Sequence, residues 1–221
     1  PLNKNGPDYE RNKDRILDKI DAVDASFLTT SPSALNFLSN RNNSFYIPNP
    51  SDKSFEILNN YSNPCNVDVF FALSHGVHRG VLKLGKTDDR VNFVNKLISN
   101  TPNVKFDIYG LNNVQPIWAD HYFKTIANAK MGLNLSRGEA IKYYSSDRIT
   151  QIVGNGLVCL IDEKTQYRDF FNDNEMVFYK NLNDLSEKIL KFSQDEKLRK
   201  KIGRRGRDKY LKYFNSIEVA D

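Results

Sequence analysis

The chain has 221 residues, of which 39% are hydrophobic and 27% are charged, and its formal net charge is +5. Its 14 Phe and 11 Tyr residues supply apolar surface for a sizeable core, which excludes a wholly disordered chain. No run approaches the roughly 18 apolar residues that a membrane span requires, and no apolar stretch near the start resembles a secretory signal. This length fits one large domain, or one domain with part of another.

The N-terminal part predicts short elements. Apolar residues at helical spacing predict a helix over 8–24, and short apolar runs predict strands at 26–30 and 45–47. Ser31-Pro32 supplies an N-cap and a first-turn proline, which predict a helix through about Leu38.

A dense turn signal follows at Pro48-Asn49-Pro50-Ser51-Asp52. We place a domain boundary there, with residues 1–49 as the end of one domain and its linker, and residues 50–221 as the next domain. The chain begins with Pro1, so we expect a processed chain or an excised part of a longer protein.

After the linker, strands and helices alternate. Predicted strands lie at 67–73, 104–109, 131–135, 157–161 and 176–179. Predicted helices lie at 88–99, 118–130, 147–154, 165–172, 182–193 and 195–213. Short, nearly continuous apolar strands are typical of a sheet that helices cover on both faces. The pattern predicts an α/β fold with a Rossmann-like, doubly wound parallel sheet.

Both cysteines, Cys65 and Cys159, lie in apolar runs that resemble strands. We expect them to be buried free thiols, which favours a reducing, cytoplasmic setting over a disulfide framework.

The positive charge concentrates in 197–212, where nine residues are basic. The same stretch has an apolar side formed by Leu198, Ile202, Tyr210 and Phe214. We therefore expect a terminal amphipathic helix with a solvated basic face, rather than a nucleic-acid site. Contact of this face with anionic lipid headgroups, at the inner membrane face, is an alternative.

Ligands in doubly wound sheets bind beyond the carboxyl ends of the strands. The first strand of the second domain ends at Ser74, and His75, Arg79 and Lys86 follow among glycines. Glycines let backbone N–H groups approach a ligand, and the cations can neutralise a diphosphate. The loop matches neither G-x-G-x-x-G nor a Walker A motif, which disfavours NAD and P-loop nucleotides. A basic loop without a ligand is the alternative.

His75 is a weak candidate for a general base, because no nearby carboxylate or cysteine completes a catalytic triad or a metal set. The second strand ends in Tyr109-Gly110. Gly110 permits a sharp exit and Tyr109 could contact a flat base, although an ordinary strand exit explains both residues equally well.

The loop after the third strand has the most polar and cationic groups. Its candidate ligand-binding residues are Lys142, Tyr143, Tyr144, Ser145, Ser146, Asp147 and Arg148. Ser146 or Asp147 can cap the next helix, whose positive end would then favour a phosphate beside Lys142 and Arg148. The alternative is a capped surface loop, in which Arg148 pairs with an acid such as Asp147 or Glu139.

Several segments in order resemble the C-terminal, donor-binding domain of GT-B nucleotide-sugar glycosyltransferases, in the group 1 branch related to spore-maturation proteins. The segments that carry the resemblance are 45–50, 147–158, 167–171, 175–179, 182–185 and 202–207. The similarity covers most of residues 44–215.

The resemblance implies a domain that holds the nucleotide diphosphate of an activated sugar without a bound metal or another cofactor. Arg79 and Lys86 match basic positions of the family, and Tyr109-Gly110 lies where the base is held. Residues 143–148 lie where the diphosphate and the sugar are held, and Gln151 lies where a carboxylate usually grips the ribose.

The sequence departs from the family at two positions. Retaining enzymes commonly have Glu at the position of Gln151 and another Glu eight residues earlier, where this chain has Tyr143. Gln can still hydrogen-bond ribose hydroxyls but lacks the charge, so retention or inversion stays open. Residues 1–47 resemble only the last elements of the family's N-terminal acceptor domain.

We therefore expect a glycosyltransferase that moves a sugar from a nucleotide-diphosphate sugar to a glycan or lipid-linked acceptor. Arg79, Lys86, Lys142 and Arg148 would stabilise the departing diphosphate. Two alternatives stay open: a non-catalytic module that binds a nucleotide or a sugar phosphate, and a basic surface module.

Overall fold

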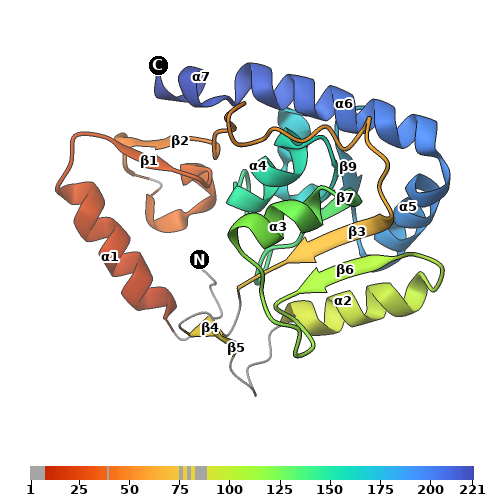
Figure 1. The fold of residues 1–221 in the computed structure, drawn as a ribbon. Helices are drawn as coiled ribbons and strands as arrows, with labels where there is room; N and C mark the ends of the chain where they lie inside the picture. Colours follow the sequence, from red (N-terminus) through yellow and green to blue (C-terminus); the bar gives the residue numbers. More distant parts are fainter. Residues whose placement is uncertain (1–7, 39, 75–76, 79–80, 83–88) are drawn as a thin grey trace.

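The computed structural model describes residues 8–38, 40–74, 77–78, 81–82 and 89–221 (Figure 1). Its larger part is a five-stranded sheet in the order β6-β3-β7-β8-β9, and every pair of neighbours is parallel. The strands are β3 (Val67–Ala72), β6 (Phe106–Tyr109), β7 (Ala129–Asn134), β8 (Val158–Asp162) and β9 (Val177–Tyr179). This topology confirms the predicted α/β fold with a Rossmann-like parallel sheet.

Helices cover both faces of this sheet. They are α2 (Asp89–Asn100), α3 (Ala119–Ile126), α4 (Asp147–Gly154), α5 (Leu182–Gln194) and α6 (Glu196–Tyr213), and a short α7 (Ser216–Ala220) follows. One core contains buried residues of α2 and α5, and the other contains those of α3 and α4. Helix α6 contributes to both cores, through Ile202 and Tyr210.

Strand β3 shows why the strands are apolar almost throughout. Val69 and Phe71 enter one core, and Phe70 between them enters the other. Side chains alternate between the two faces of a strand, so a strand with both faces covered needs apolar residues at consecutive positions.

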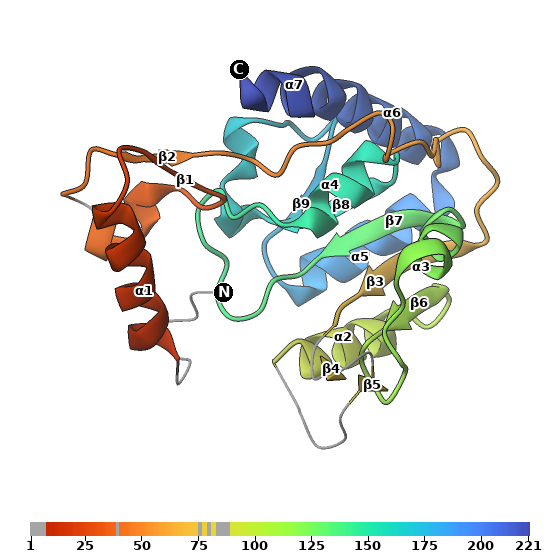
Figure 2. The ribbon, with the colours of Figure 1, turned by 60° about the vertical axis from the view of Figure 1, so that its left-hand side comes forward.

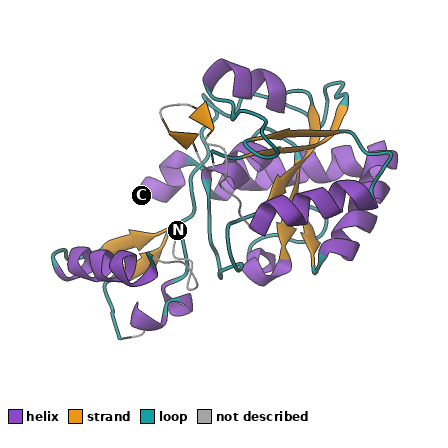
Figure 3. Ribbon diagram, turned by 90° about the horizontal axis from the view of Figure 1, so that it is seen from below, coloured by secondary structure: helices purple, strands orange, loops and turns teal. Residues whose placement is uncertain are grey.

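The N-terminal part forms a small unit of its own. It contains α1 (Tyr9–Asp21) and the parallel pair β1 (Ser26–Leu28) and β2 (Ser44–Tyr46), around a small core of Ile20, Leu35 and Leu38. Figures 2 and 3 show this unit beside the five-stranded body, joined to it by loops. A short antiparallel hairpin, β4 (Val77–His78) and β5 (Val81–Leu82), follows β3.

Two predicted helices are wrong. The segment 32–38 forms two 3₁₀ turns, Pro32–Ala34 and Asn36–Leu38, because Leu35 between them has extended backbone. The segment 165–172 contains a 3₁₀ turn at Tyr167–Asp169, preceded by Gln166 at a left-handed φ of 55°. A residue in that conformation interrupts a right-handed helix.

The turn-rich segment after β2 is fixed against the larger body. The Asn49 N–H donates to Ser145 Oγ at 2.9 Å. The Asn49 carbonyl accepts from Tyr210 Oη at 2.8 Å and from Thr150 Oγ1 at 3.0 Å. The segment around Asn49 therefore crosses α4 and α6 and is held to both helices by hydrogen bonds. The domain boundary at residues 49 and 50 stays a prediction.

The two cysteines differ. Both are free thiols, but Cys65 lies before β3 and is half-buried, so the prediction of burial is wrong for it. Cys159 lies within β8 and is buried. Burial raises the pKa of both thiols above the usual value, which disfavours the reactive thiolate.

Helix α6 has the amphipathic character that the sequence predicts. Ile202 and Tyr210 are buried, whereas Lys201, Arg204 and Arg205 are exposed. Within the described ranges, no helix combines the length and the apolar character needed to cross a bilayer.

Helix α4 lies unusually close to the sheet at Gly132 of β7. A Cβ atom at residue 132 would lie 2.5–2.8 Å from Cγ1, Cδ1 and Cγ2 of Ile152, all closer than van der Waals contact. Ile152 is fully buried, so it has little room to move away. The missing side chain at Gly132 is what lets α4 pack at this depth.

We predict that Gly132→Ala lowers the free energy of unfolding by about 1–3 kcal/mol, because the added methyl overpacks the contact with Ile152. Ile152→Ala alone should cost about 2–5 kcal/mol through the cavity that it leaves. The added methyl would fill part of that cavity, so the double variant should lose clearly less than the sum. Urea denaturation of the three variants measures the coupling, and additive losses would contradict this packing.

Candidate functional site

The carboxyl ends of the parallel strands meet at one edge of the sheet. Ser74 lies just beyond β3, Ser136 and Arg137 lie just beyond β7, and α4 begins at the same edge with Asp147. Loops of this edge are where parallel α/β sheets bind ligands. The candidate site therefore lies where the loops after β3 and β7 meet the start of α4.

At the N-terminus of α4, the N-cap side chain accepts no hydrogen bond from the first backbone N–H groups of the helix. Ser146 has the extended backbone of an N-cap residue, but its side chain makes no capping hydrogen bond. Its Oγ instead lies 3.3 Å from Asn134 Oδ1 at the end of β7. A helix N-terminus carries partial positive charge, and uncapped N–H groups there can bind an anion.

Arg148, in the first turn of α4, is held over the sheet edge. Its Nη1 donates to the Leu135 carbonyl at 3.2 Å, and its Nε lies 3.4 Å from the Ala72 carbonyl. The guanidinium carbon lies 5.3 Å from the centre of the Phe71 ring. Burial, and then the charge of Arg90, lower the pKa of Arg148 below its usual value. A neighbouring anion would relieve that electrostatic cost.

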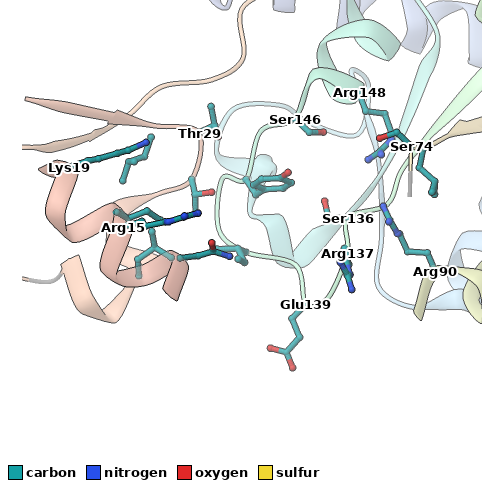
Figure 4. A pocket seen from close by; sticks show the side chains of 18 residues that line it. Arg15, Lys19, Thr29, Ser74, Arg90, Ser136, Arg137, Glu139, Ser146 and Arg148 are labelled. Carbon is teal, nitrogen blue, oxygen red and sulfur yellow. The ribbon is translucent and has the colours of Figure 1, made fainter. Parts of the chain in front are cut away.

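A cleft of about 870 Å³ lies in front of this edge. One wall is formed by the sheet-edge residues Ser74, Ser136, Arg137 and Arg148, and the other by α1 and the segment after β1 (Figure 4). Such a volume suits a ligand of the size of a nucleotide or a nucleotide sugar.

The lining is strongly cationic. Among the described residues, five basic side chains and one acidic side chain line the cleft: Arg15, Lys19, Arg90, Arg137, Arg148 and Glu139. Figure 4 shows Arg15 and Lys19 reaching toward the cleft from one side, with Arg90, Arg137 and Arg148 on the other. The excess positive charge favours an anionic ligand.

Four predicted site residues line this cleft: Ser74, Tyr144, Ser146 and Arg148. The alternative of a surface Arg148 that pairs with a neighbouring acid is wrong, because the side chain is only partly exposed and its hydrogen bonds go to carbonyl groups.

Tyr109 and Gly110 lie at the same edge but are absent from the described lining. The Tyr109 ring packs edge-on against His121 and contacts Phe70. Gly110 has a φ of 76°, and a Cβ there would collide with the Leu73 carbonyl, so this position requires glycine for the backbone alone. Contact with a base stays a prediction.

Lys142 and Tyr143 are absent from the described lining of the cleft. Tyr143 has a left-handed φ of 58°, and its ring packs against Tyr46 and Phe170. The Tyr143 hydroxyl donates to Asp169, and the Lys142 ammonium lies 4.8 Å from the centre of the Tyr143 ring. The Tyr143 ring thus belongs to an aromatic cluster, and the predicted contacts of Lys142 and Tyr143 with a donor stay untested.

Ser145, Asp147 and Gln151 also lie outside the described lining. Ser145 is buried, its N–H donates to the Thr29 carbonyl at 2.7 Å, and its Oγ accepts from the Asn49 N–H. Ser145 therefore joins the N-terminal unit to the sheet-edge loop. Asp147 is exposed and Gln151 is partly buried on α4. Their predicted contacts with a donor stay untested.

The remaining predicted residues, His75, Arg79 and Lys86, lie outside the described residues. Within the described ranges, no group of three or more His, Cys, Asp or Glu side chains is placed to hold a metal ion.

The sequence analysis missed the residues that α1 contributes. Asn12, Arg15 and Lys19 line the cleft from this helix. Their spacing of three and four residues places them on one helical face, which the sequence alone could have shown. That this face lies opposite the sheet edge depends on tertiary structure.

Residues 90–221, more than half of the chain, match the sequence family described as glycosyl transferase-like. The chain therefore belongs to the glycosyl transferase-like family. No curated protein sequence matches it.

Solved structures of GT-B glycosyltransferases share the fold, which confirms the resemblance to that class. The crystal structure of TarM has a TM-score of 0.67 at 16% identity, and sucrose-phosphate synthase from Thermosynechococcus elongatus has 0.61 at 11%. HepE from Anabaena, in complex with UDP and glucose, has 0.60 at 11%. The matches cover 95%, 98% and 89% of this chain but only 44%, 61% and 61% of those chains.

We predict that Tyr143→Phe leaves the affinity for a nucleoside diphosphate within twofold of the wild type, because Tyr143 belongs to the aromatic cluster. Loss of its hydrogen bond to Asp169 should cost about 0.5–1.5 kcal/mol of stability. Tyr144→Ala, at a residue that lines the cleft, should weaken binding. Isothermal titration compares the affinities of the two variants. A tenfold loss of affinity in Tyr143→Phe would show that Tyr143 contributes to ligand binding.

Proposed function

We propose that this chain is the donor-binding part of a glycosyltransferase that moves a sugar from a nucleotide-diphosphate sugar to a glycan or lipid-linked acceptor. One observation carries the proposal: Arg148 and the uncapped start of α4 converge on a cationic cleft at the carboxyl edge of the sheet. Membership of the glycosyl transferase-like family supports it.

The site suits the chemistry of the leaving group. When the bond between the anomeric carbon and the diphosphate oxygen breaks, negative charge grows on that oxygen. Donors that are already fixed stabilise such charge without reorganising during the reaction. Arg148 meets this requirement, because the carbonyls of Leu135 and Ala72 hold its guanidinium in place.

We propose uracil as the base of the donor. Among the similar structures, a TarM variant from S. aureus is in complex with UDP, and HepE is in complex with UDP or UDP-glucose. Because the identities to those proteins are only 10–15%, UDP is proposed as the first ligand to test.

We also propose that diphosphate binding needs no resident metal, because arginine side chains and the α4 N-terminus supply positive charge at the sheet edge. Gln151 and Tyr143 stand where retaining relatives commonly have Glu, so sugar transfer and donor binding must be tested separately. A chain that binds the donor without transfer or hydrolysis in the intact protein would be a binding module.

We predict that UDP binds and that uridine binds at least tenfold more weakly, since most of the attraction is to the diphosphate. Arg148→Ala should weaken UDP binding by about tenfold to a hundredfold, the cost of a lost charge-assisted contact. Arg148→Lys should recover only part of the loss, because an ammonium lacks the planar fork of donors. Isothermal titration measures all four affinities.

The matched control is Arg204→Ala, which removes the same charge from the exposed face of α6, beside Asp208. It should bind UDP as the wild type does. Because Arg148 also bonds two carbonyls, circular dichroism must show a folded Arg148→Ala protein at the titration temperature. A folded Arg148→Ala with wild-type affinity would remove Arg148 from the site. Loss of UDP binding on adding EDTA would contradict the metal-free proposal.

A further inference from the structure

The α1 wall of the cleft carries positive charge that lies across from the sheet edge. Arg15 and Lys19 project from α1 toward the cleft, and Asn12 lies one turn before them on the same face (Figure 4). Residues spaced by three and four positions form a continuous stripe on a helix. The stripe is therefore one polar surface with two cations and an amide.

Ion pairing separates this stripe from the other cations of α1. Arg11 pairs with Asp8 at 2.8 Å, and Lys13 pairs with Glu10 at 2.5 Å. Within the described part of the chain, Arg15 and Lys19 form no ion pair. On α1, the cations outside the cleft lining, Arg11 and Lys13, are thus paired with acidic residues. Those that line the cleft, Arg15 and Lys19, are available for an external anion.

The opposite wall already has enough charge for the donor. Each phosphoryl group of a nucleotide-diphosphate sugar carries a single negative charge. Arg90, Arg137 and Arg148, together with the N-terminus of α4, lie on that wall. The diphosphate therefore does not need the cations of the α1 wall, which line the cleft on the side opposite the sheet edge.

We propose that Arg15 and Lys19 bind an anionic group of the acceptor, a phosphate, sulfate or carboxylate, so that the acceptor of this enzyme is itself negatively charged. The inference rests on the proposed function, because it divides one cleft between donor and acceptor. The α1 cations orient the acceptor by its charge, while the sheet-edge cations hold the diphosphate.

Charge in a cleft is less screened than charge on an open surface, since walls of low dielectric focus the field. Arg15 and Lys19 are nevertheless exposed, so their attraction should fall steeply with salt. The preference for an anionic acceptor should be largest at low ionic strength.

The test uses protein saturated with UDP, so that the donor side is occupied. Four oligosaccharide-sized probes are titrated: a heparin tetrasaccharide, its desulfated form that keeps the carboxylates, a glycerol phosphate oligomer, and neutral maltotetraose. The anionic probes separate sulfate, carboxylate and phosphate as the recognised group. The variant is Arg15→Ala with Lys19→Ala, and its matched control is Arg11→Ala with Lys13→Ala, which removes two charges from the same helix.

We expect at least one anionic probe to bind the wild type at least tenfold more tightly than maltotetraose. The Arg15 and Lys19 double variant should lose about tenfold to a hundredfold of that affinity while binding UDP within twofold of the wild type. The Arg11 and Lys13 double variant should match the wild type in both measurements.

Three results would overturn the inference: no preference for any anionic probe, equal losses in the two double variants, or a loss of UDP affinity in the Arg15 and Lys19 variant as large as the loss for the probe. UDP binding by the wild type is measured first, on its own. Failure at that step contradicts the donor site, whereas normal UDP binding with any of the three results contradicts the acceptor assignment alone.

Discussion

The close approach of α4 to the sheet is the constraint on which the site depends. At Gly132 the sheet offers no side chain, so Ile152 of α4 packs directly on the backbone of β7. On its opposite side, α4 packs against α6, and Thr150 of α4 donates a hydrogen bond to the Asn49 carbonyl. Held between these surfaces, α4 places Arg148 where its guanidinium reaches the carbonyls of Ala72, at the end of β3, and of Leu135, just beyond β7.

The same arrangement explains why the two sides of the cleft stay together. The loop before α4 bonds the N-terminal unit through the backbone: the Ser145 N–H donates to the Thr29 carbonyl, and the Ser31 N–H donates to the Lys142 carbonyl. Tyr143 adds ring contacts with Tyr46. The loop before α4, which the sequence predicts to bind a ligand, thus also connects the N-terminal unit to the larger body. Several of its residues make contacts between the two units.

Much of the fold was predictable, because strands covered on both faces must be apolar throughout, as Val69, Phe70 and Phe71 show. The helix at 147–154 was also predicted with its observed bounds. The missed features depend on single backbone conformations: Leu35 is extended, and Gln166 has a positive φ that helical spacing does not reveal.

The site was predictable in part for a related reason. Parallel strands bring their following loops to one edge, so Ser74, Ser146 and Arg148 could be expected together. The direction of a side chain within a loop was not predictable, because the positive φ of Tyr143 turns its ring into the aromatic cluster. Nor could the sequence show that Arg15 and Lys19 face that edge, since this contact joins segments far apart in the chain.

The most direct measurement is a structure of the chain with UDP bound. The account predicts that the diphosphate lies at the N-terminus of α4, within hydrogen-bond distance of the Arg148 guanidinium, with Arg15 and Lys19 across the cleft and not in contact with it. A nucleotide seated elsewhere, for example beside Arg205 and Lys212 on α6, where a second hollow lies, would contradict the account.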